Sequence, residues 1–166
     1  PVIYYGSEMG FERGRAEHQG NRNYYGIERI AQARSHPIRQ ALSAIARLRA
    51  QSPALQKGIQ INLELSGDRA AYYRAYNDGE QAQIALVLLN KADQPANFVI
   101  DRWLEPGQWR SGLDHSAAEV RENGSLSAQV SAHGVQVFLL DQAVQGAELR
   151  ALLDQAMADL PHRSDG

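Results

Sequence analysis

The stretch that decides the fold is residues 59–65, which read Ile-Gln-Ile-Asn-Leu-Glu-Leu. Apolar and polar side chains alternate along it, which is the period of a β-strand with one buried face. The next residues, Ser66-Gly67-Asp68, are typical of a turn, and residues 70–76 read as a second strand. This pattern predicts the beginning of an antiparallel sheet.

The same strand pattern continues toward the C-terminus. Residues 83–90 form a nearly continuous apolar run, which suits the middle of a sandwich. Turn residues such as Pro106-Gly107 and Asn123-Gly124 divide the later residues into short segments, and His115 and His133 also fall in predicted turns. Further short strands are expected at residues 98–100, 108–111, 118–121, 126–130 and 135–140. Short strands at this spacing predict an antiparallel β-sandwich over residues 57–142.

The residues before the sandwich have a different character. Residues 2–5, Val-Ile-Tyr-Tyr, read as one buried strand. Residues 6–34 are rich in glycine without a sustained period, and a short helical turn is expected at 27–33. A loop of this length is often functional. Residues 35–53 then predict an amphipathic helix that starts at a capping serine with proline in the first turn. One strand and one helix cannot bury their own apolar faces, so we interpret residues 1–56 as the last β/α unit of a larger domain and expect a longer parent polypeptide.

The C-terminal segment, residues 143–166, predicts one more helix. Apolar side chains recur at helical spacing between Leu149 and Leu160, and Pro161 ends the pattern. Two interpretations remain open. The helix either docks on the parent protein or links it to a further segment.

Composition excludes several classes of protein. The chain has 166 residues, a net charge of −2 and 22% charged residues, and its basic residues form no stripe of the kind that nucleic-acid binders use. It has no cysteine, so disulfides, thiolate zinc sites and a cysteine nucleophile are excluded. No apolar run is long enough for a membrane-spanning helix. Glu17 and His18 have no third ligand at a supportive spacing, and no metal or other cofactor is expected.

Three segments together resemble the α-amylase family. Residues 1–8, Pro-Val-Ile-Tyr-Tyr-Gly-Ser-Glu, resemble the family's strand eight segment, P-x-I-Y-Y-G-x-E. Gly20-Asn21-Arg22 look like the end of its G-x-D-P-x-N-R stretch. Residues 48–58, Leu-Arg-Ala-Gln-Ser-Pro-Ala-Leu-Gln-Lys-Gly, resemble the junction into the C-terminal sandwich, called domain C. The resemblance covers residues 1–141 and is greatest to cyclodextrin glucanotransferases, maltogenic amylases and cyclomaltodextrinases.

The resemblance implies a TIM (β/α)8 barrel followed by domain C, and a retaining enzyme that acts on α-1,4-glucans such as starch, maltooligosaccharides or cyclodextrins. In the family the catalytic carboxylates come from strands four, five and seven. They would therefore precede residue 1, and we assign no catalytic residue to this chain. The implied partner is the N-terminal barrel of the same polypeptide. The compartment is unknown, with a secreted or periplasmic location as a family-based expectation.

Residues 7–26 follow strand eight and are expected at the active-site face of the intact enzyme. Arg22 matches the family arginine that supports a donor-side sugar subsite. The family's aspartate four residues earlier is His18 here, so either Glu17 takes its place or His18 itself donates to a sugar hydroxyl. Tyr25 either stacks on a sugar ring or anchors the loop. Glu8 is expected to hold the pocket wall rather than to contact sugar.

Three classes of function remain at this point. The first is the C-terminal portion of an α-glucan-acting enzyme. The second is a non-catalytic carbohydrate-binding module that uses Trp103 and Trp109, whose aromatic faces would stack on glucose; the alternative for both tryptophans is packing in the core or at a sheet edge. The third is a purely structural sandwich. The position of the tryptophans distinguishes the last two classes.

Overall fold

The computed structural model describes residues 26–159. The chain divides into two compact units, residues 1–48 and residues 49–166. The expected strand at residues 2–5 and the glycine-rich loop after it lie outside the described residues. The first unit is therefore described only in its helical part.

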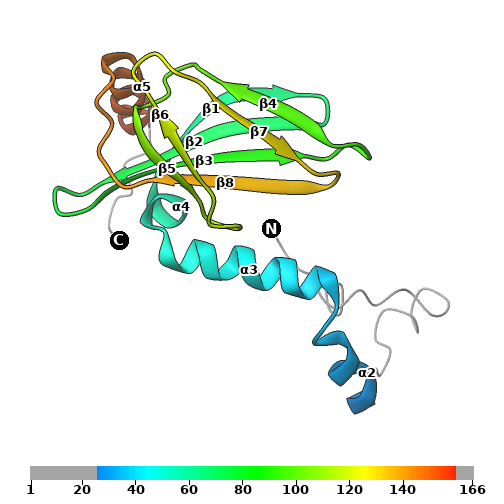
Figure 1. Ribbon diagram of the computed structural model, residues 1–166. Helices are drawn as coiled ribbons and strands as arrows, with labels where there is room; N and C mark the ends of the chain where they lie inside the picture. The colour runs from blue at the N-terminus through cyan, green and yellow to red at the C-terminus, as the bar shows by residue number, and fades with distance from the viewer. Residues whose placement is uncertain (1–25, 160–166) are drawn as a thin grey trace. The chain divides into compact units, whose positions relative to one another are not determined.

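The first unit contains two helices (Figure 1). α2 spans Gly26–Ala33, in agreement with the helical turn expected there. α3 spans Pro37–Gln51, and its start at the predicted proline is confirmed. The predicted cap by Ser35 is wrong, because its Oγ donates to the Gln32 carbonyl at 3.0 Å, and His36 Nδ1 instead accepts from the Ile38 N–H at 3.3 Å. Along the predicted apolar stripe Leu48 is buried, whereas Ile38 and Ile45 are 46% and 40% exposed.

A short helix connects α3 to the sandwich within the second unit. α4 spans Pro53–Lys57 and is capped by Ser52, whose Oγ accepts a hydrogen bond from the Leu55 N–H at 3.2 Å. Gly58 ends the helix by donating its N–H to the Ala54 carbonyl at 2.9 Å. A β-carbon at Gly58 would lie only 2.5 Å from that same carbonyl oxygen, so the close approach requires glycine. The serine, proline and glycine of the junction segment thus each have a structural role.

The second unit is mainly β, as predicted, and all its strand pairs are antiparallel. Six strands form one sheet in the order β1-β2-β3-β8-β5-β6, and β4 and β7 form a second sheet (Figure 1). Each strand lies within two residues of its predicted position. The strands are β1 (Ile59–Ser66), β2 (Arg69–Asn77), β3 (Ala82–Asn90), β4 (Ala96–Ile100), β5 (Gly107–Ser111), β6 (Ala117–Val120), β7 (Leu126–Val130) and β8 (Gly134–Leu140).

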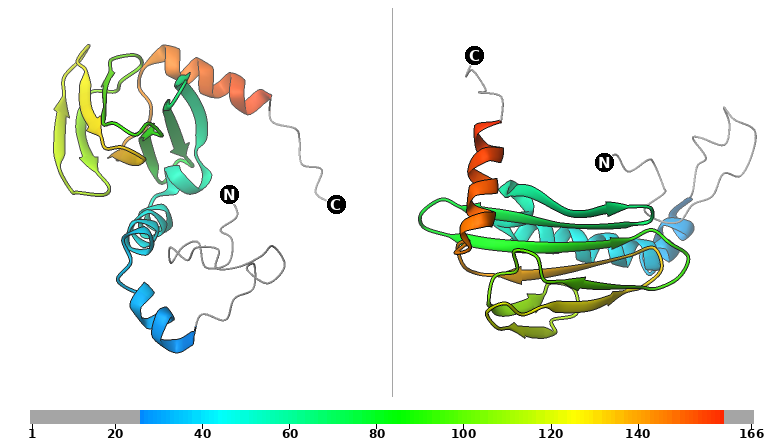
Figure 2. Two further views of the ribbon diagram at one scale, coloured as in Figure 1. Left: turned by 90° about the vertical axis from the view of Figure 1, so that its right-hand side faces the viewer. Right: turned by 90° about the horizontal axis from the view of Figure 1, so that it is seen from above.

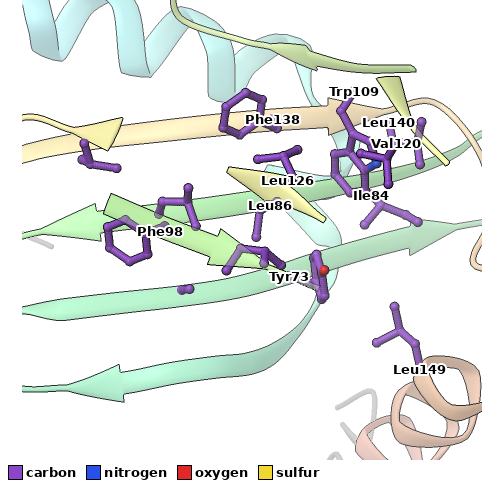
Figure 3. Packing of buried hydrophobic residues seen from close by; sticks show 14 residues of the cluster. Tyr73, Ile84, Leu86, Phe98, Trp109, Val120, Leu126, Phe138, Leu140 and Leu149 are labelled. Atoms are coloured by element: carbon purple, nitrogen blue, oxygen red, sulfur yellow. The ribbon is translucent and has the colours of Figure 1, made fainter. Parts of the chain in front are cut away.

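The core lies between the two sheets (Figure 3). Phe98 of β4 and Leu126 of β7 pack toward Tyr73 and Leu86 of the large sheet, and all four are at most 2% exposed. Arg69 reinforces the edge of this contact. Its Nε donates to Glu64 Oε1 at 2.7 Å, its Nη1 donates to the Asn97 carbonyl at 2.9 Å, and its guanidinium lies 4.0 Å from the centre of the Phe98 ring.

The C-terminal helix packs on the sandwich itself. α5 spans Ala147–Ala158 and lies across one end of the strands (Figure 2). Leu149 enters the core cluster and is 1% exposed, and Leu153 packs against the same cluster. The packing agrees with the interpretation of a docked helix, although the apolar stripe alone does not identify the sandwich as its partner.

No helix among the described residues is long and apolar enough to cross a membrane. Within residues 26–159, no group of three or more His, Asp or Glu side chains is arranged to hold a metal ion.

Candidate functional site

The site residues predicted from the sequence are Glu8, Glu17, His18, Arg22 and Tyr25, and all five lie outside the described residues. Their roles therefore stay predictions. The structure contains a different candidate site, which belongs entirely to the second unit.

A surface hollow of about 580 Å³ lies between the segment that links β4 to β5 and the first turn of α5. Its volume is within the range of roughly 300–1,000 Å³ that is usual for small-molecule sites. Apolar and acidic side chains are mixed along its wall. The lining residues are Asp101, Trp103, Leu104, Glu105, Pro106, Glu122, Asn123, Gln145, Gly146, Ala147, Glu148 and Leu149.

Trp103 is the one aromatic residue among the described residues that line the hollow. Its indole Nε1 donates a hydrogen bond to Glu148 Oε2 at 2.9 Å, which ties the ring to α5. The guanidinium of Arg102 stacks 3.8 Å from the indole centre. The backbone of Trp103 has φ 54°, in the left-handed region that a bulky residue rarely adopts. The two side-chain contacts help to hold this unfavourable conformation, and thereby fix the ring at the rim of the hollow.

Trp109 has a different role. It is completely buried, its Nε1 donates to the Glu105 carbonyl at 2.9 Å, and its ring centre lies 6.4 Å from that of Tyr73 (Figure 3). The interpretation as core packing is therefore confirmed for Trp109. A sugar-stacking surface that includes both tryptophans is excluded. Trp103 is half-buried and packs partly against the core cluster, and it also lines the hollow.

Glu105 is the buried acid of the hollow, with 4% of its surface exposed. Its Oε1 accepts hydrogen bonds from the backbone N–H groups of Gln145 at 3.0 Å and Gly146 at 2.8 Å, directly before α5. A carboxylate is stabilised at the N-terminal end of a helix. Its Oε2 forms no hydrogen bond with any described residue, although Glu105 lines the hollow. Glu105 therefore anchors α5 with one oxygen and keeps the other as an acceptor.

The charged side chains that line the hollow are all acidic. Asp101, Glu122 and Glu148 line it together with Glu105, and no Lys, Arg or His of residues 26–159 does. The effect reaches Tyr73, whose hydroxyl donates to the Arg102 carbonyl at 3.2 Å. Burial raises the pKa of Tyr73 well above its usual value, and the negative charges of Glu105 and Asp101 raise it further.

Hydrogen-bond donors line the same hollow. Gly146 is the N-cap of α5 and forms no side-chain hydrogen bond to the first turn. The first N–H groups of a helix have no partner within it and carry a partial positive charge. The first-turn residues Ala147, Glu148 and Leu149 line the hollow, as do the amide side chains of Asn123 and Gln145. Acceptors and donors thus face the same space.

A second polar cluster has a structural role. Gln83 is buried, and its Oε1 accepts a hydrogen bond from Ser52 Oγ at 2.5 Å, whereas its Nε2 donates to Asp141 Oδ1 at 2.7 Å. Asp141 also pairs with Arg110. This chain of contacts attaches the α4 junction to β3 and to the end of β8. Its members are occupied by one another, so we assign it to the stability of the fold.

The two histidines in turns are exposed, as predicted. His133 has φ 50° and its Nε2 lies 2.8 Å from Asp93 Oδ1, and His115 has φ 61°. Neither histidine lines the hollow beside Trp103.

No family model matches the sequence, and no curated protein matches it. The fold, however, is similar to that of several solved structures. The α-amylase of Anoxybacillus is 19% identical with a TM-score of 0.64, and the match covers 88% of this chain and 30% of that one. The α-amylase of Geobacillus thermoleovorans, solved with acarbose, is 19% identical with a TM-score of 0.62 over 86% of this chain and 30% of that one.

A cyclomaltodextrin glucanotransferase with a three-domain ABC arrangement is 21% identical with a TM-score of 0.57, over 86% of this chain and 29% of that one. The chain therefore shares the fold of part of α-amylase-family enzymes and spans about 30% of the length of these structures. The expected antiparallel β-sandwich agrees with these similarities, whereas the expected barrel strand lies outside the described residues.

Proposed function

We propose that this chain is the C-terminal portion of an α-glucan-acting retaining glycosidase or transglycosylase. It would supply the last strand, loop and helix of the TIM barrel, and then domain C. The observation that carries the proposal is the junction at residues 52–58. The segment resembles the family's entry into domain C, and the cap at Ser52 and the close approach at Gly58 give that entry a physical basis.

The proposed substrate is starch, a maltooligosaccharide or a cyclodextrin. Residues 7–26 would form one wall of the substrate cleft, with Arg22 at a donor-side sugar subsite and either Glu17 or His18 beside it. Tyr25 would line this wall and Glu8 would support it. Solved structures of similar fold are complexes with acarbose and with maltose, which supports a glucan ligand for this chain as well.

The remaining partner in the proposal is the N-terminal barrel of the same polypeptide. The face of the large sheet that is turned away from the core supports a covering domain. Tyr72, Val87 and Val137 lie side by side across β2, β3 and β8 there, and they form an apolar row that alternates with the core-facing residues.

The experiment compares the full-length parent with this chain alone on maltoheptaose and on starch, with products separated by chromatography. Shortened, cyclic or transferred glucans from the parent, and no products from the chain alone, are the expected result. Products from the chain alone would place catalytic carboxylates within it and refute the proposal. An inert parent would instead favour the alternative of a non-catalytic carbohydrate-binding module.

A further inference from the structure

We propose that the hollow beside Trp103 binds a neutral carbohydrate, and that its ligand is a short stretch of α-glucan. This glucan site lies on the sandwich and uses none of residues 7–26. The choice of α-glucan among sugars rests on the proposed function, whereas the hydroxyl-rich nature of the ligand is inferred from the donors, acceptors and apolar side chains of the hollow.

The polar groups of the site suit hydroxyls better than an anion. The carboxylates of Asp101 and Glu122 and the Oε2 of Glu105 accept hydrogen bonds, and these acids repel an anion. The N-terminal turn of α5 and the amides of Asn123 and Gln145 supply hydrogen-bond donors to the same hollow. A hydroxyl group both donates and accepts, so adjacent hydroxyls of a sugar satisfy both sets at once.

The apolar part of the site suits the C–H face of a sugar ring. Trp103, Leu104, Pro106 and Leu149 line the hollow. Trp103 packs partly against the core cluster, and Arg102 stacks on its ring, so a sugar would contact the part of the indole that lines the hollow. These apolar side chains are mixed with acids and amides along the wall, so a ring that carries both C–H and hydroxyl groups can contact both kinds of group.

The site is held in place before a ligand arrives. Glu105 is more than nine-tenths buried, and its two hydrogen bonds fix the start of α5 against the segment before β5. Trp103 is fixed by Glu148 and Arg102 in a strained backbone conformation. Rigid groups lose little conformational entropy on binding, which favours affinity for a small ligand. Strain at Trp103 is also consistent with a residue that is held for a function.

Isothermal titration calorimetry of the full chain with maltoheptaose tests the proposal. We expect saturable binding in which Trp103→Gly weakens the affinity by about tenfold or more, the order associated with removal of a central aromatic anchor. Glycine is chosen because it tolerates the positive φ at this position, so the variant removes the ring without adding backbone strain. Trp103→Phe retains an aromatic face and should bind with an affinity between the two.

A matched pair of acids controls for charge. Glu122→Gln should weaken binding several-fold because Glu122 lines the hollow, whereas Glu119→Gln on β6, which does not line it, should leave the affinity unchanged. Spermidine serves as the cationic probe and should not compete. Thermal melts of each variant separate loss of the site from loss of the fold.

Three outcomes would overturn the proposal: no binding of any oligosaccharide, equal affinity of wild type and Trp103→Gly with both folded, or tighter binding of spermidine than of maltoheptaose. If the chain binds cellohexaose but not maltoheptaose, and Trp103→Gly weakens that binding, the hollow is still a sugar site. The α-glucan function would then be contradicted. If the parent acts on α-glucans but this chain with Trp103→Gly binds maltoheptaose as tightly as the wild type, the proposed function stands and the site beside Trp103 is refuted.

Discussion

Replacing Glu105 with alanine should detach the first turn of α5 from the sandwich. The change removes two hydrogen bonds from backbone N–H groups to a buried carboxylate, at 3.0 and 2.8 Å. Hydrogen bonds to charged groups contribute about 1.5–3 kcal/mol each, and a charge at a helix N-terminus adds roughly 0.3–1 kcal/mol. Gln145 and Gly146 are exposed, so water compensates part of the loss when the carboxylate is removed. We therefore expect the free energy of unfolding to fall by about 2–4 kcal/mol.

Urea denaturation of the full chain, monitored by far-ultraviolet circular dichroism, measures this loss. Glu105→Gln keeps an oxygen that accepts from the same N–H groups but removes the charge, so it should cost about 1 kcal/mol. Glu119→Ala, at an exposed position on β6, is the control and should change stability by less than about 0.5 kcal/mol. Equal stabilities of Glu105→Ala and Glu119→Ala would refute the role of Glu105 as the anchor of α5.

Three further changes test the fold. Trp109→Ala should lower the free energy of unfolding by about 3–5 kcal/mol in chemical denaturation, because the ring is fully buried; a loss below roughly 1 kcal/mol would contradict its place in the core. Gly58→Ala should cost about 1–3 kcal/mol by the same measurement, because the new β-carbon would lie 2.5 Å from the Ala54 oxygen and 3.0 Å from the Ala75 oxygen; an unchanged midpoint would contradict that close approach. The raised pKa of Tyr73 means that the folded state favours the protonated phenol. The resulting contribution to the free energy of unfolding is complete at a pH below the ordinary tyrosine pKa of 10.0, and it is lost as the pH rises above that value. In Tyr73→Phe this pH-dependent loss should be smaller in denaturation curves above that pH, and an identical loss would contradict the shift.

The strands could be predicted from the sequence because alternation is a local signal. Residues 59–65 alternate along β1, and turn residues mark where most of the later strands begin and end. The order of the strands could not be predicted in this way. Nothing in the sequence of residues 134–140 indicates that β8 pairs with β3 on one side and β5 on the other, since both contacts are distant along the chain.

The candidate site on the sandwich was difficult to predict for the same reason. Glu105 meets Gln145 and Gly146 across 40 and 41 residues, and no spacing rule connects them. The two tryptophans look alike in the sequence. Trp109 shares a face with Ser111 on β5, and both are buried, but only the packing of the sheet shows which face is inward. Trp103 takes its position from a left-handed backbone conformation for which its sequence gives no signal.

The barrel-side predictions depend on sequence resemblance alone. Arg22, His18, Glu17, Tyr25 and Glu8 all belong to residues 1–25, outside the described part of the chain. Arginine suits the proposed task because its planar guanidinium binds a carboxylate and a hydroxyl at the same time. The replacement of the family aspartate by His18 is the departure from the pattern that most directly concerns this subsite.

Proton NMR of the anomeric signals during maltoheptaose turnover by the full-length parent tests the central claim most directly. A retaining mechanism forms the α-anomer first, and mutarotation then produces the β-anomer. The account predicts early α-anomer signals from the parent and an unchanged spectrum with this chain alone. Early β-anomer signals, no turnover of any α-glucan by the parent, or turnover by this chain alone would contradict it.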